Sequence, residues 1–174
     1  MAFPTFASGD VLNATDMNAV GLWLVKSQTV GSAVSSVTVS SAFSATYDSY
    51  KIIWTGGTAS TNVDLYLTLG ASSLYNWSAV YSAFNAIPTA AGTTTGTYFN
   101  YCGGATTTWG GAQFELHRPF LSQATFYNAQ NVNFAAGINT VGFLNNSTSY
   151  TSFTITPSTG TITGGTLNVY GYKK

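Results

Sequence analysis

The sequence predicts an all-β fold, an antiparallel β-sandwich of the jelly-roll type preceded by a short N-terminal arm with a small helix. Apolar and polar residues alternate with a period of two in many short segments, which is typical of half-buried strands. Residues that form turns separate these segments at intervals of about 8–15 residues, as in sandwiches and jelly rolls. A chain of 174 residues is also of ordinary size for one such domain.

The N-terminal arm comprises residues 1–21, and the β domain is expected over residues 22–174. A short helix is predicted over 13–21, where Asn13 is a suitable N-cap, Asp16 faces the positive end of the helix dipole and Gly21 ends the helix. A helix this short is not stable alone, so the arm must pack against another surface. Its large apolar side chains are the candidate docking residues: Phe3, Phe6, Leu12 and Met17.

The strongest strand signal lies in residues 63–69, where Val63, Leu65, Leu67 and Leu69 share one face. The other expected strands show shorter or less regular alternation: 35–39, 50–55, 97–101, 112–117, 124–128, 139–144, 152–156 and 166–172. Glycine pairs at 56–57, 103–104, 110–111 and 164–165 are expected to end strands or form turns. Residues 86–96, rich in Ala, Thr and Gly, are expected to form a loop.

Charged side chains are unusually few. Five Lys or Arg and five Asp or Glu make up 6% of the chain, whereas soluble domains average about 25%. A net charge near zero favours association and argues against nucleic-acid binding, which needs a basic patch. No signal peptide or apolar run long enough to cross a membrane is present. The composition therefore predicts a structural or attachment protein made in the cytoplasm, with no nucleic-acid partner and no membrane insertion.

Groups that carry chemistry are scarce. One histidine is too few for a histidine metal cluster, and the sequence has no G-x-S-x-G or phosphate-loop motif. Glu115 and His117 share one face of a predicted strand, either as an acid–base pair or, the favoured interpretation, as a structural pair. Cys102, the only cysteine, is expected to be a small core residue rather than a nucleophile. We expect no catalytic residue, metal or cofactor, and no enzymatic activity.

Several aromatic residues lie in or beside segments rich in Gly, Ala and Thr. Exposed rings next to amide and hydroxyl groups suit a glycan-binding surface, and Tyr and Trp are also enriched at subunit interfaces, which is the favoured interpretation. The candidate glycan or partner contacts are Tyr75, Trp77, Tyr81, Tyr98, Tyr101 and Trp109.

Three segments, in order along the chain, carry a resemblance to a known family. Residues 6–19, FASGDVLNATDMNA, resemble the F-x-x-G-D-V-L-T-A-x-D-M-N start of many tailed-bacteriophage fibre and virion proteins. Residues 47–52, YDSYKI, are similar to the Y-D-x-Y-x-I element of their β domains, and residues 164–173 resemble their final strand. Residues 70–135 match no motif of these proteins.

The resemblance implies a jelly-roll-like domain, homotrimeric and mounted on the virion through the N-terminal arm. The expected function is that of a compact tail-fibre or capsid-decoration subunit, for host attachment or for the particle surface. Its partners would be other copies of the chain, other virion proteins and, as a further candidate, a host surface glycan. A stand-alone carbohydrate-binding module or lectin is the alternative, and a glycan depolymerase is disfavoured because acids are sparse and histidine is single.

Overall fold

A computed structural model describes residues 8–9 and 21–172, and in these residues the chain is all-β, with 13 strands, no helix and only antiparallel pairing. The predicted fold class is therefore confirmed at the level of an all-β, antiparallel chain. The four docking candidates, Phe3, Phe6, Leu12 and Met17, lie outside the described residues, as does the expected helix apart from Gly21.

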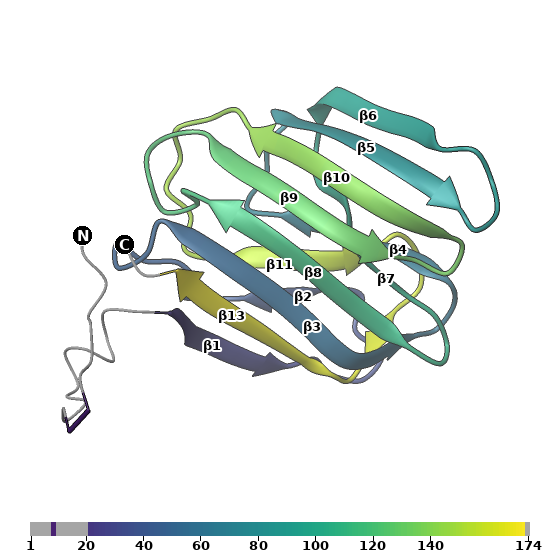
Figure 1. The fold of residues 1–174 in the computed structure, drawn as a ribbon, viewed down its shortest axis with the longest axis horizontal. Coiled ribbons are helices and arrows are strands. Elements are labelled where there is room, and N and C mark those ends of the chain that lie inside the picture. Colours follow the sequence, from purple (N-terminus) through teal and green to yellow (C-terminus); the bar gives the residue numbers. More distant parts are fainter. Residues whose placement is uncertain (1–7, 10–20, 173–174) are drawn as a thin grey trace.

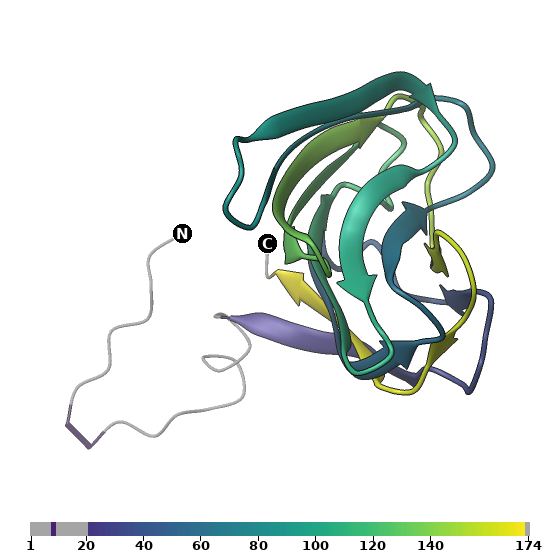
Figure 2. The ribbon, with the colours of Figure 1, turned by 90° about the vertical axis from the view of Figure 1, so that its right-hand side faces the viewer.

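The strands form two layers (Figure 1). The front layer has the order β6 (Thr89–Gly96), β5 (Tyr75–Ala83), β10 (Ala136–Leu144), β9 (Thr125–Val132), β8 (Gly110–His117), β3 (Ser49–Ala59), β13 (Thr166–Tyr172), β1 (Leu22–Thr29). Behind it lie β2 (Val37–Val39), β11 (Phe153–Pro157), β4 (Val63–Thr68) and β7 (Phe99–Ala105), in that order. The short β12 (Ile162–Thr163) pairs with the end of β3. Figure 2 shows that the strands curve around a common interior.

The two layers join at β8. One edge of this strand pairs with β3, and its other edge pairs first with β7 and then with β9. The contact with β7 uses only small residues, Gly103–Ala105 against Gly110–Ala112. A Cβ atom on Gly103 would lie 2.4 Å from the carbonyl oxygen of Gly111. The junction therefore depends on residues with no side chain or only a methyl group.

The core lies between the layers and follows the alternation along each strand. Tyr50, Ile52 and Trp54 of β3 point inward and are almost fully buried. The face predicted for residues 63–69 is confirmed, because Val63, Leu65, Leu67 and Leu69 are all buried. The larger inward side chains from both layers complete this core: Phe99, Phe114, Leu116, Tyr127, Leu144, Phe153 and Leu167.

Two expectations about turns and loops are wrong. Residues 86–96 do not form a loop throughout, because Thr89–Gly96 is strand β6 and pairs with β5. The glycines at 103–104 lie inside β7 and those at 56–57 lie inside β3 rather than in turns, whereas those at 110–111 begin β8. These segments consist of small or β-branched residues, which permit close strand approach but show no clear alternation of apolar and polar side chains.

Candidate functional site

A row of polar side chains covers the outward face of the central front strands. Residues Phe114 and Ala129 point into the core, so their strand neighbours point outward, away from the core. We call the resulting surface the amide face, and it consists of Lys51 from β3, Gln113 and Glu115 from β8, Asn128 and Gln130 from β9, and Asn139 from β10.

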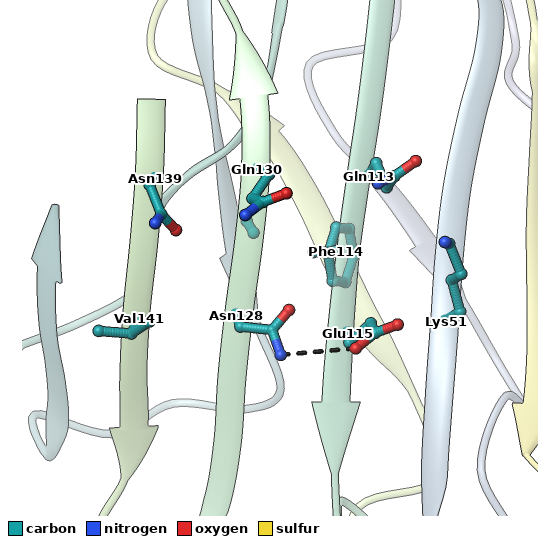
Figure 3. Close-up of a pocket in the computed structure, with 9 residues that line it drawn as sticks. Lys51, Gln113, Phe114, Glu115, Asn128, Gln130, Asn139 and Val141 are labelled. Atoms are coloured by element: carbon teal, nitrogen blue, oxygen red, sulfur yellow. Dashed lines mark hydrogen bonds between the residues drawn. The ribbon is translucent and has the colours of Figure 1, made fainter. Parts of the chain in front are cut away.

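The register of the strands places these side chains in two rows (Figure 3). Asn139 pairs with Gln130, and Gln113 extends that row on β8. In the second row, Asn128 lies between Val141 on β10 and Glu115 on β8, and Glu115 pairs in turn with Lys51. A hollow of about 460 Å³ lies over these residues.

Glu115 is held by two neighbours. Its Oε1 accepts a hydrogen bond from the Tyr172 hydroxyl, and its Oε2 lies 3.5 Å from the Asn128 amide nitrogen. Burial, the hydrogen bond to Glu115 and the negative charge of Glu115 together raise the pKa of Tyr172 to about 12. The carboxylate is thereby oriented along the row, with Lys51 on the other neighbouring strand.

His117 belongs to the same network and sits at its end. Its Nδ1 lies 2.9 Å from Ser49 Oγ, and its Nε2 lies 3.5 Å from the Asn128 amide nitrogen. His117 is thereby linked to Ser49 on β3 and to Asn128 on β9. Glu115 and His117 share a face, as the sequence predicts. Each contacts Asn128, and in the described part of the chain the two side chains make no hydrogen bond to each other. This geometry suits a structural network.

Three amides of this face are unused. Within the described part of the chain, the side chains of Gln113, Gln130 and Asn139 make no hydrogen bond to another protein group. Gln113 and the adjoining Gln130 and Asn139 are exposed to solvent. Each amide offers two donor hydrogens and one acceptor oxygen, so together they present both kinds of group to anything that enters the hollow.

An aromatic surface continues the amide face beyond Val141. A second hollow of about 480 Å³ is lined by Phe126 and Phe143 and by polar residues of β5 and β6. The two rings are 6.4 Å apart and tilted by 44°, and the Arg118 guanidinium lies 4.5 Å from the centre of the Phe126 ring. Val141 lines both hollows, so the polar and aromatic surfaces are contiguous.

The aromatic residues selected from the sequence do not form one site. Tyr75 is fully buried, and its hydroxyl bonds with the backbone of Leu69 and Gly70, so its ring is not at the surface of this chain. Trp77 and Tyr81 of β5 lie beside Tyr101, with ring centres 5.9 and 6.2 Å from that of Tyr101. All three are partly buried against a small cluster of Ala79, Ala136 and Ile138.

The remaining two candidates lie elsewhere. Tyr98 stacks on Tyr66, with ring centres 4.1 Å apart. Burial, together with Tyr98 and Asp64, raises the pKa of Tyr66 to about 12. Trp109 is exposed and lies just before β8.

Cys102 is fully buried, as expected for a core residue, and burial raises the pKa of its thiol far above the usual range. Among the described residues no group of three or more His, Cys, Asp and Glu side chains is arranged to bind a metal ion. No helix within the same residues is long and apolar enough to cross a membrane.

Comparison with protein-family models, with curated proteins and with solved structures finds no match to this chain. The amide face was missed in the sequence. The available signal was the set of outward positions in segments 112–117 and 124–128, which hold Gln, Glu, His, Phe and Asn.

Proposed function

We propose that this protein is a structural subunit of a bacteriophage virion, a compact tail-fibre or capsid-decoration protein that associates as a homotrimer. The observation that carries the proposal is a concentration of exposed apolar side chains at one end of the front layer. The self-association follows from this patch, and the virion assignment follows from the sequence resemblance.

The patch, which we call the hairpin-end patch, consists of Val80, Phe84, Ile87, Val132 and Phe134. Ile87 is 86% exposed, Phe84 is 65% exposed, and the other three are also exposed. The backbone N–H of Phe84 donates to the Ala135 carbonyl, which brings the end of β5 next to the turn between β9 and β10. Contiguous apolar surface of this kind on a soluble chain marks an interaction site.

Few charges oppose contact between copies. The described residues carry six of the ten charged side chains, and none belongs to the patch. The patch is therefore apolar and holds no charge that would repel a second copy. Covering it with another copy removes from water the rings and aliphatic groups that are otherwise exposed. A trimer is the closed assembly that the resemblance implies.

The same proposal includes the finer fold, a jelly-roll-like sandwich. Its support is the presence of two layers of antiparallel strands around one core, with the C-terminal strand β13 placed between β1 and β3. Such a domain is a common building unit of particle surfaces. Segments 47–52 and 164–173, which resemble virion proteins, form or adjoin the neighbouring strands β3 and β13.

Sedimentation velocity of the full chain at micromolar concentration tests the association. We expect a species with three times the 18.3 kDa chain mass. Phe84→Glu combined with Ile87→Glu should shift the protein to monomer, because charged groups buried at an interface are costly without partners. The matched control is Leu24→Glu, which changes an exposed apolar residue on β1 outside the patch and should leave the trimer intact.

Two results would contradict the proposal. A wild-type chain that sediments as a stable monomer excludes the homotrimer. Antibodies against the protein should also label purified tailed particles whose genome encodes it. If such particles lack the protein, the virion role is excluded.

A further inference from the structure

We propose that the amide face and the adjoining aromatic hollow bind an uncharged oligosaccharide. The site comprises Gln113, Asn128, Gln130 and Asn139 for the hydroxyl groups, with Phe126 and Phe143 for the apolar face of a sugar ring. This proposal goes beyond the assembly role and does not depend on it, since it uses different side chains.

The unused amides define the chemistry of the ligand. Sugar hydroxyls both donate and accept hydrogen bonds, as the side chains of Gln113, Gln130 and Asn139 do. These three residues lie on three adjacent strands, which span about 10 Å at the usual strand spacing of ~4.8 Å. That length suits two linked sugar units lying across the strands, each within reach of an amide.

The aromatic hollow supplies the second element of sugar recognition. Phe126 and Phe143 are 41% and 38% exposed, so each ring has surface available for contact. The C–H groups on one side of a sugar ring pack against such a surface, and the hydroxyls at the ring's edge remain free for polar groups. Val141 connects this hollow to the amide face, so one chain of sugars is able to contact both.

The charges in the site favour a neutral ligand. The hollow over the amide face contains one cation, Lys51, and one anion, Glu115, on neighbouring strands, and the aromatic hollow has, among the described residues, a single cation beside it, Arg118 against the Phe126 ring. A phosphate backbone or a polyanionic glycan requires several cations in its binding site, and the negative charge of Glu115 would repel such a ligand.

A second copy of the chain fits this face less well than a sugar does. A dry protein surface over the amide face would leave the amides of Gln113, Gln130 and Asn139 without hydrogen-bond partners, which costs free energy. The hairpin-end patch lacks these amides and is the better site for another copy. Val80 nevertheless pairs with Asn139 across β5 and β10, and Val132 follows Gln130 two residues along β9, so a bound sugar would lie beside the subunit contact.

The test begins with the full chain on an array of neutral and acidic oligosaccharides. The best neutral binder is then titrated by isothermal calorimetry against wild type, Gln130→Ala, Asn139→Ala and Phe143→Ala. Each substitution should weaken binding about threefold to tenfold, as expected for the loss of one hydrogen bond or one ring contact. Gln130 and Asn139 have no described side-chain partner, so their replacement should leave the thermal unfolding temperature unchanged.

Asn62→Ala is the matched control, since Asn62 is an exposed amide outside the site, in the turn between β3 and β4. It should bind as wild type does. Absence of binding to every neutral oligosaccharide at millimolar concentration overturns the proposal, as does binding that all three site variants retain. Binding confined to acidic glycans also overturns it.

The assembly variant Phe84→Glu with Ile87→Glu separates this proposal from the proposed function. A monomeric variant that still binds the sugar supports the site and leaves the trimer as a separate property. A trimeric wild type that binds no neutral sugar retains the structural role and loses only the binding site.

Discussion

Replacing Gly103 by alanine should destabilise the fold by a measurable amount, because this residue lies where the two layers join. A Cβ atom at position 103 would lie 2.4 Å from the carbonyl oxygen of Gly111, 2.6 Å from Ala112 Cβ and 2.7 Å from Ala112 Cα. All three atoms belong to the paired strand β8. A methyl group at this position therefore meets two backbone atoms and the Cβ atom of Ala112, none of which can rotate away.

The magnitude follows from two opposed effects. Forcing an extra methyl group into packed surroundings costs about 1–3 kcal/mol, and contact with backbone places Gly103 at the upper end. Alanine also lowers the conformational entropy of the unfolded chain, which offsets about 0.4–1 kcal/mol. We expect a net loss of about 2 kcal/mol in the free energy of unfolding, and hence a fall of about 4–8 °C in melting temperature.

Gly137→Ala is the matched control, since it places the same methyl group on strand β10 with no atom within 4 Å. Its backbone is not in the left-handed region, so the control should be neutral or slightly stabilising. Both variants are unfolded in urea and by heat at one fixed protein concentration, with circular dichroism as the signal, because association makes the melting temperature concentration-dependent. Equal stability of the Gly103→Ala and Gly137→Ala proteins would refute the reasoning.

The strands that the sequence located best are those whose alternation is visible within one segment. The segment 63–69 alternates strictly and becomes β4 with all four apolar residues buried, and 166–172 coincides with β13. In these segments burial of one strand face is the dominant constraint, and it produces an alternation of apolar and polar residues that is visible within the segment itself. Prediction succeeded for these segments because no distant partner needs to be known.

The glycine pairs show why the remainder was not predictable. A glycine pair in isolation indicates a turn, but at 103–104 and 110–111 it permits two strands to approach closely. Gly57 has a similar role, because a Cβ atom there would overlap the Trp54 ring, at 1.9 Å from its nearest atom. Which role a glycine has depends on the strand or ring packed against it, and the glycine itself carries no signal of that neighbour even when it is close in the sequence, as Ala112 is to Gly103 and Trp54 is to Gly57.

The amide face was beyond the sequence for the same reason. Its residues come from four strands, and only the register among these strands places Gln130 beside Asn139 and Asn128 beside Glu115. A shift of one residue in any strand would turn those side chains toward the core. The turn aromatics were selected by local composition instead, and Tyr75 is in fact a core residue whose hydroxyl bonds with the backbone.

Two further predictions concern groups whose pKa is raised. Cys102 should resist a thiol reagent in the native protein and react fully in denaturant, because it is completely buried and burial raises the pKa of its thiol; rapid stoichiometric labelling of the native chain would show that the thiol is accessible. Tyr172→Phe removes the hydroxyl that donates to Glu115, so near pH 7 it should lower the free energy of unfolding by about 0.5–1 kcal/mol. The folded-state pKa of Tyr172, about 12, lies above the usual value of 10.0. Its stabilising effect is therefore complete below pH 10 and is lost as the pH rises through 12. The free energies of unfolding of wild type and Tyr172→Phe are compared by urea unfolding at intervals from pH 8 to 12. Their difference should stay constant up to about pH 10 and shrink above it. A difference that persists unchanged to pH 12 would mean that the neutral hydroxyl does not stabilise the fold through Glu115.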